Sequence, residues 1–136
     1  MSSELSIECA LARTALWCEQ AVALTRLEMA GAAVAIALGV RAVAPRAVQV
    51  LLEDSDQGDW LVITGWADEQ GFEHEVGDWP VSEEVDQAAS HLYTPQVRHV
   101  VGVSEIREGR RVLGYRIGVD TVLAAHGRFA RVDCRE

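Results

Sequence analysis

Histidines flanked by carboxylates are the residues of this chain best suited to proton transfer. Glu73, His74 and Glu75 are consecutive, and His99 lies in a later apolar segment. A histidine beside a carboxylate can act as a general base because it titrates near neutral pH. Neighbouring side chains in a strand point to opposite faces, however, so His74 should face away from both glutamates. A partly buried, hydrogen-bonded histidine is the favoured interpretation, and catalysis by His74 or His99 with a nearby carboxylate is the alternative.

Three aspartates in one short segment, Asp54, Asp56 and Asp59, form the pattern closest to a cation-binding loop. The EF-hand form needs two flanking helices and a glutamate at the twelfth position, where this chain has Gly65. Aspartate and glycine are also ordinary turn residues. The segment therefore favours a turn between strands over a cation site. No histidine has zinc-ligand spacing to another histidine or to cysteine, so we expect no metal, no cofactor and no catalytic residue.

Three cysteines and no lysine further limit the chemistry. Cys9 and Cys18 lie about half a revolution apart on a helix and cannot pair with each other there. An odd cysteine number gives no disulfide framework, which is typical of a reduced, cytoplasmic protein. The lack of lysine excludes Schiff-base and P-loop mechanisms. The lack of both lysine and asparagine indicates a very GC-rich genome, such as that of a high-GC bacterium.

Tryptophan is unusually frequent, with four residues against two Phe and two Tyr. Tryptophan is common both in cores and at binding hot spots. Trp60 and Trp66 are expected on one strand face with Val62 and Thr64, as core beneath a long helix or as a groove for a peptide or small ligand. We predict partner-binding roles for Trp17, Leu24, Trp60, Trp66 and Trp79.

The segment 4–38 reads as one long helix because it is rich in Ala, Leu and Glu and lacks proline. Ser3 or Ser2 is expected to cap its start, and Gly39 to follow its end. An apolar stripe runs along it, and Trp17 and Leu24 lie roughly opposite that stripe. The stripe consists of Leu5, Cys9, Ala12, Leu16, Ala23, Leu27, Ala30 and Val34.

Such a helix would be about 50 Å long, too long for a compact monomer of this size. It must therefore break, for instance near Gly31, or project and pair with another chain.

The rest of the chain predicts short antiparallel strands and further helices in the order α-βββ-α-ββ-α, an α+β sandwich. Strands are expected at 47–53, 60–67 and 72–76, a helix from Pro80 to about Leu92, a hairpin of strands 97–106 and 112–119, and a helix at 121–126. We expect a single domain over 1–136, with a helical segment at 1–45, sheet and helices at 46–126 and a loose tail at 127–136.

The net charge of −9 is unevenly distributed. Residues 46–94 hold one Arg and twelve acids, whereas residues 95–136 hold eight Arg and five acids. An acidic protein repels nucleic acid and anionic membranes, so neither is an expected partner. Surface charge paired within the molecule is one interpretation, and an acidic face over 53–86 that attracts a basic protein is the other.

The N-terminal residues predict no secretory signal, since Glu4 and Glu8 interrupt any apolar run. The most apolar window, 29–40, is too short to cross a bilayer, and a buried core helix is the better interpretation. We therefore expect a cytoplasmic protein.

The inferred element order over residues 4–126, together with the acidity, is similar to that of the small homodimeric type III secretion chaperones and of YbjN-like domains. The chaperones are acidic dimers that wrap an unfolded segment of a client. The resemblance implies a dimeric binding protein, and no sequence motif or functional residue is carried over by it.

Together these observations predict a small acidic homodimer that binds another protein without catalysis, as an inhibitor, immunity, chaperone-like or regulatory protein. The alternative is a small-ligand-binding protein or modest enzyme with a pocket between helices and sheet. An enzyme needs an enclosed pocket with convergent polar groups, which a protein-binding surface does not.

Overall fold

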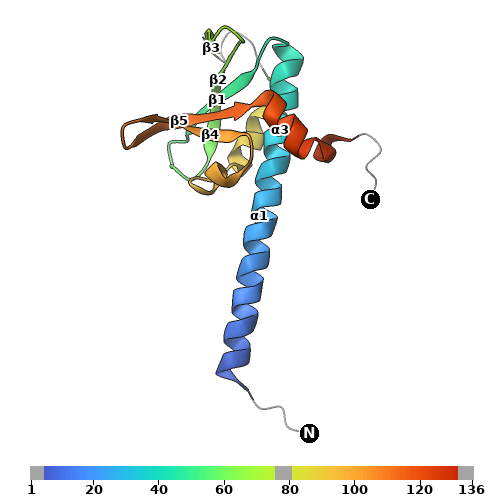
Figure 1. Ribbon diagram of the computed structural model, residues 1–136, viewed down its shortest axis with the longest axis vertical. Helices are drawn as coiled ribbons and strands as arrows, with labels where there is room; N and C mark the ends of the chain where they lie inside the picture. Colours follow the sequence, from blue (N-terminus) through green and yellow to red (C-terminus); the bar gives the residue numbers. More distant parts are fainter. Residues whose placement is uncertain (1–4, 76–80, 132–136) are drawn as a thin grey trace.

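The computed structural model describes residues 5–75 and 81–131, so Trp79 lies outside the described residues. The fold is α+β, as the sequence predicts, with a long N-terminal helix, a five-stranded antiparallel sheet and further helices. Figure 1 shows that the upper part of the long helix lies against the sheet, while its lower part projects away from the rest of the molecule.

The strands are arranged in the order β3-β2-β1-β5-β4. β1 (Gln49–Asp54) is central and pairs with β2 (Leu61–Ala67) and β5 (Arg111–Gly118). β3 (Glu73–Glu75) and β4 (Val103–Glu108) form the two edges. The expected meander of three strands and the expected hairpin are both present, and β1 joins them into one sheet.

A register shift between β1 and β2 changes which side chains of β2 face the core. Leu51 pairs with Gly65, but Leu52 pairs with Ile63, which leaves Thr64 as an extra residue. A one-residue bulge moves the side chains that follow it to the other face of the sheet.

The prediction that Trp60, Val62, Thr64 and Trp66 share one face is therefore wrong. Ile63, before the bulge, is buried in the core, whereas Val62 is 40% exposed. Trp66, after the bulge, packs against the same core. Trp60 lies before the strand proper, half-buried, and forms an isolated bridge with Tyr93.

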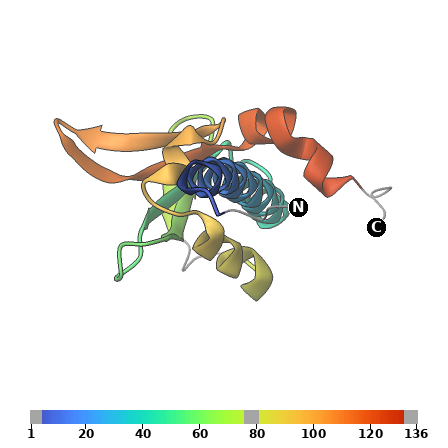
Figure 2. The ribbon, with the colours of Figure 1, turned by 90° about the horizontal axis from the view of Figure 1, so that it is seen from below.

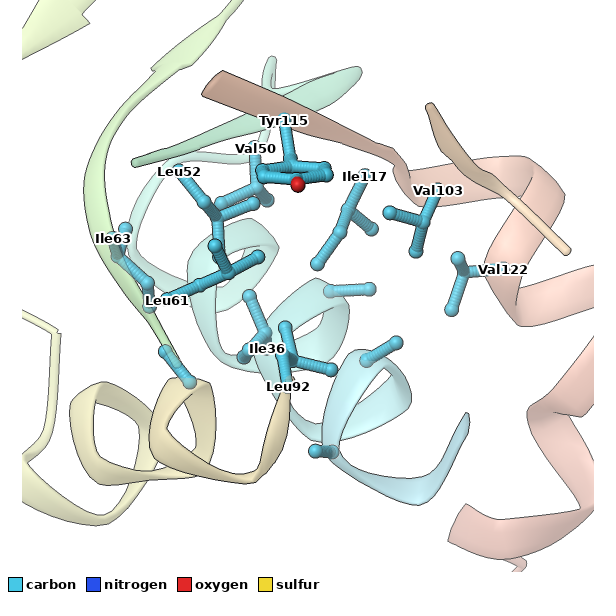
Figure 3. Close-up of a cluster of buried hydrophobic side chains, with 14 of the residues drawn as sticks. Ile36, Val50, Leu52, Leu61, Ile63, Leu92, Val103, Tyr115, Ile117 and Val122 are labelled. Carbon is cyan, nitrogen blue, oxygen red and sulfur yellow. The ribbon is translucent and has the colours of Figure 1, made fainter. Parts of the chain in front are cut away.

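The core lies between this sheet and the C-terminal half of the long helix, α1 (Ile7–Val43). Figure 3 shows Ile36 of α1 facing strand side chains that include Leu61 and Ile117, with Leu92 beside it. The helix also contacts α2 (Glu83–Ala88) and α3 (Val119–His126). These helices flank α1, as the view along its axis in Figure 2 shows.

α1 is continuous through Gly31, so the first of the two alternatives, a break there, is wrong. Its cap is Ser6, whose hydroxyl accepts a hydrogen bond from the Cys9 N–H, and not Ser2 or Ser3, which lie outside the described residues. The prediction that Gly39 follows the helix is also wrong. Gly39 lies inside the helix, which ends at Val43, before Pro45. A Cβ at this position would lie 2.3 Å from Cγ2 of Val85, so the glycine allows α2 to pack closely against α1.

The expected strand over 97–106 begins only at Val103. Before it, Gln96–His99 forms a 3-10 helix, η3, that buries Val97, and Val100 is buried three residues later. This spacing fits a three-residue period and not the two-residue period of a strand. Gly102 then turns the chain with a φ of 96°, close against Val122.

Two further segments complete the chain. After α2, Ala89–His91 forms a short 3-10 helix, η2. After α3, Gly127–Ala130 forms another, η4, which contacts α1. The first part of the C-terminal tail is therefore ordered against the helix and not loose as expected. Residues 132–136 lie outside the described residues.

Candidate functional site

The projecting part of α1, residues 7–28, is the most unusual surface of the molecule, and we call it the arm. Every residue of the arm is exposed except Thr25, which is half-buried. At 1.5 Å per residue the arm is about 33 Å long. In Figure 1 the lower part of the arm extends away from the rest of the described chain. The helix projects, which is the first part of the second alternative, while its pairing with another chain stays a prediction.

Large apolar side chains on the arm are open to solvent. Trp17 is 62% exposed and Leu24 is 65% exposed. The other large apolar side chains of the arm that are open to solvent are Ile7, Leu11, Leu16, Val22 and Leu27. A helix that is apolar on several sides is normally buried in a core, in a helix bundle or in a membrane. The arm therefore presents a surface that a solitary chain leaves uncovered.

The predicted apolar stripe of this helix is only partly buried. Its last two members, Ala30 and Val34, belong to the core, while Leu16 and Leu27 are about half exposed. The stripe runs straight along the helix, but the domain covers only the C-terminal half of it.

Glu28, at the base of the arm, forms hydrogen bonds with the domain. The Tyr93 hydroxyl donates a hydrogen bond of 2.5 Å to Glu28 Oε2, and His91 Nδ1 lies 2.7 Å from the same oxygen. The hydrogen bond from Tyr93, followed by the one from His91, holds the pKa of the Glu28 carboxyl below its usual value. The same bond raises the pKa of Tyr93. These contacts fix the direction in which the arm leaves the domain.

A shallow crease of about 310 Å³ lies where the arm meets η3. Its lining is mainly apolar and includes Val22 and Met29 of α1, with Gln96 and His99 of η3 across from them. Met29 itself is fully buried. His99 therefore lines a hollow, but no carboxylate is among the lining residues, so the expected histidine–carboxylate pair is not formed there.

His74 lies in a small polar cluster at the β3 edge of the sheet. Its Nε2 is 3.5 Å from Oδ2 of Asp68, and its ring stacks on Trp66 with a centroid distance of 4.0 Å. Burial raises the pKa of Asp68, but backbone N–H groups of Phe72 and Gln70, together with His74, hold that pKa below its usual value. His74 is half-buried and hydrogen-bonded, as predicted.

A hollow of about 670 Å³ lies open on the outer face of the sheet and is lined by Glu53, Thr64 and Glu73 among others. His74 is a lining residue, but its ring lies with Trp66, whereas Glu73 and Glu75 alternate to the opposite face. Asp68 does not line the hollow. The carboxylates of the hollow and the imidazole of His74 are thus on different sides of β3.

No group of three or more His, Cys, Asp or Glu residues that could hold a metal ion occurs within residues 5–75 and 81–131. Asp54, Asp56 and Asp59 are exposed around the turn that connects β1 and β2. Among the acidic residues between 53 and 86 that the structure describes, all are exposed except Asp68, which is buried. Asp78 lies outside the described residues. The exposed acids surround the β1–β2 turn, β3 and α2.

One helix of the described chain, α1, is long and apolar enough to cross a membrane by length and composition alone. In its most apolar 18-residue window, 39% of the residues are buried inside the domain. The segment 29–40 is a core helix, as the sequence indicates, with side chains such as Ile36 and Val40 fully buried. The core thus accounts for part of the apolar character of α1.

The structure separates the residues that the sequence analysis grouped as a binding site. Trp17 and Leu24 are on the arm, whereas Trp60 and Trp66 are half-buried at the sheet and Trp66 contacts the core. The prediction missed Ile7, Leu11 and Val22, which are exposed on another side of the arm. These three residues lie on the same side of α1 as the buried Met29 and Ile36. The helical spacing of the five apolar residues could have identified them from the sequence.

No protein-family model matches the chain, and no curated protein or solved structure matches it either. The resemblance to secretion chaperones and YbjN-like domains therefore stays a prediction from element order and charge.

Proposed function

We propose that this protein is a non-catalytic protein-binding module that acts as a small acidic homodimer, with the arm as its binding element. The observation that supports this most directly is the projection of residues 7–28 away from the domain with large apolar side chains exposed. Inhibitor, immunity, chaperone-like and regulatory roles all use such a surface. The compartment we propose is the cytoplasm, from the unpaired exposed cysteines Cys9 and Cys18.

The amount of exposed surface supports association. The chain exposes 9372 Å², whereas a compact monomer of 14.8 kDa exposes roughly 7000 Å². The arm contributes part of this excess. A standard stable interface buries about 800 Å² on each partner, so an excess of this order is sufficient for one.

The arm offers more apolar surface than one paired helix would cover, because Trp17 and Leu24 lie on a different side from Ile7, Leu11 and Val22. One side is proposed for self-association and the Trp17 side for a protein partner. The exposed acids around β3 and α2 favour a partner with basic groups.

Catalysis is the less favoured function because neither His74 nor His99 faces a carboxylate across a hollow. His74 does lie 3.5 Å from Asp68, but Asp68 does not line the open hollow. His74 is separated from the carboxylates of the open hollow, and the crease beside His99 has no carboxylate.

Sedimentation equilibrium of the purified full chain tests the proposal. We expect a dimer mass at micromolar concentration, and dissociation when serines replace Ile7, Leu11 and Val22 on the side of the arm proposed for self-association. The matched control is Val62→Ser on the outer face of the sheet, since Val62 is similarly exposed at 40% but lies off the arm. A monomer at every concentration, or equal effects of arm and control substitutions, would contradict the proposal.

A further inference from the structure

We infer that two copies of this chain pair through their arms in an antiparallel arrangement, with the two-fold axis passing beside Cys18. The inference rests on the proposed function and specifies its partner, face and orientation. On one side of the arm, the intervals between successive residues are symmetric about Cys18, so they are the same in both chain directions. We call this side the arm stripe. The arm stripe begins on the arm with Ile7, Leu11, Thr14, Cys18, Val22 and Thr25, and it ends at Met29, which lies just beyond the arm and is buried in the domain.

The arm stripe is a continuous band on the helix surface. At about 100° per residue, all of its members lie within about 40° of Cys18 around the helix axis. It consists of two 11-residue repeats, Ile7 to Cys18 and Cys18 to Met29, each with steps of four, three and four residues. Such a repeat has about 3.67 residues per turn, so the band stays nearly straight and can contact a second straight helix along its whole length.

The symmetry of the spacing fits an antiparallel partner. With the axis at Cys18, Leu11 of one copy lies opposite Thr25 of the other, and Thr14 lies opposite Val22. Ile7 reaches the level of Met29, which is buried in the domain of the other copy. The threonines do not need a polar partner in such a seam, because Thr14 and Thr25 already donate their hydroxyl hydrogens to carbonyls of their own helix. Their methyl groups can then pack in the seam.

The crease at the base of the arm lies where the end of the partner's arm would be. Met29 lines the crease from α1, and Gln96 and His99 line its opposite side from η3. The pairing brings the Ile7 side chain of the second copy to this level. Ile7 is 80% exposed, and a hollow of about 310 Å³ can accept its side chain. The seam would thus extend the buried face of α1 without interruption.

Charges beside the arm stripe also favour this orientation. Glu8 and Arg26 lie on the same flank, each about 80° from Cys18. An antiparallel two-fold axis brings equal flanks together, and it places Glu8 within about 3 Å of the partner's Arg26 along the axis. The arrangement forms two symmetric ion pairs.

The negative charge of the two domains, from which the arms project, also favours the antiparallel orientation. Parallel arms would place two acidic domains side by side, whereas antiparallel arms place them at opposite ends of a seam about 33 Å long. That separation is several times the screening length at physiological salt. The antiparallel pair thus avoids a repulsion that the parallel pair would suffer.

The orientation can be measured with the cysteines that the arm already carries. Two spin-labelled full chains are prepared, one with Cys9 as the only cysteine (Cys18→Ser, Cys134→Ser) and one with Cys18 as the only cysteine (Cys9→Ser, Cys134→Ser). Antiparallel pairing predicts that the two Cys9 sites are about 27 Å apart along the axis, while the two Cys18 sites are adjacent. Short distances at both sites would indicate parallel arms and overturn the inference, while leaving arm association intact.

The face is tested by a matched pair of leucines. Leu11 belongs to the arm stripe and is 64% exposed, whereas Leu24 lies outside it and is 65% exposed. Leu11→Ser should raise the dimer dissociation constant at least about 30-fold, because two symmetric copies of the contact are lost. Leu24→Ser should leave it within about threefold. Equal effects would overturn the arm stripe as the seam.

The ion pairs give a test of register. Glu8→Arg and Arg26→Glu should each weaken the dimer roughly 3- to 30-fold, and the double variant should restore it. The two Glu19 side chains lie on one flank near the axis, so Glu19→Gln should tighten the dimer about twofold. Failure of the double variant to recover affinity contradicts the register. A chain that remains a monomer at the highest concentration reached contradicts both the inference and the self-association in the proposed function.

Discussion

The two halves of α1 have the same backbone conformation and opposite surroundings. The half from 29 to 43 is composed mostly of alanine, glycine and valine, has Arg41 as its single charge and packs in the core. The arm has larger apolar side chains and several charges, and solvent surrounds it. Small residues let α2, α3 and the sheet approach the helix closely. Large residues on the arm create contact area that this domain does not use.

Apolar content alone therefore does not decide burial along this helix. Ile7 and Ile36 are the same residue on the same helix, yet Ile7 is 80% exposed and Ile36 is fully buried. Side-chain size, together with the sheet, α2 and α3 that pack on the helix, therefore determines which part of α1 belongs to the domain.

The largest effect expected from the comparison concerns these two isoleucines. Ile36→Ala should lower the free energy of unfolding by about 2–5 kcal/mol, because it leaves a cavity in a packed core. Ile7→Ala should change it by less than about 0.5 kcal/mol in dilute solution, because Ile7 has no contact to lose there. Urea unfolding followed by circular dichroism measures both values. A similar loss for both variants would mean that the arm folds back onto the domain.

A smaller effect is expected at Gly39, where α1 contacts α2 most closely. Replacement of a helical glycine by alanine normally stabilises a helix by up to about 1 kcal/mol. Here the new Cβ would lie 2.3 Å from the Val85 side chain, so Gly39→Ala should instead destabilise the domain by about 1–3 kcal/mol. Adding Val85→Ala should recover most of the loss. A stabilised single variant would show that α2 does not press on this part of the helix.

The smallest effect is expected at Glu28, which lies at the boundary between the two halves. Its folded-state pKa is below the ordinary value of 4.5, so its stabilisation is fully present above that value and is lost as the pH falls below it. The group is half-exposed, and Glu28→Gln should therefore cost only about 0.2–1 kcal/mol at pH 7. The difference between wild type and variant should shrink as the pH falls below 4.5. A difference that grows toward acid pH would contradict the assigned role of the Tyr93 and His91 contacts.

The pattern of apolar residues was sufficient to predict most elements of this fold. Alternating residues identified β1, β2 and β5, and the helical period identified α1. It failed at 97–106, where Val97 and Val100 are buried with a three-residue period. It also failed along β2, because one extra residue at Thr64 reverses the faces and is not visible in the alternation of the strand itself.

The candidate site was predicted only in part. The sequence predicted that Trp17 and Leu24 lie roughly opposite the main stripe, whereas at 100° per residue they lie about 100° from it, and both are exposed on the arm. The separation of Trp66 from them, and the contact of Glu28 with Tyr93 and His91, were not predictable. Those contacts join residues more than sixty positions apart, whose proximity is set by the path of the whole chain.

By itself, the sequence determined that this chain contains a long apolar helix, an antiparallel sheet and an acidic middle segment, since local periodicity and charge depend only on residue order. The tertiary structure alone decided where along that helix the domain ends. The sheet is only wide enough to cover one half of α1, and the core is complete once residues 29–43 are packed. Packing between elements distant in the sequence, rather than the hydrophobicity of the helix, therefore left the arm exposed to solvent.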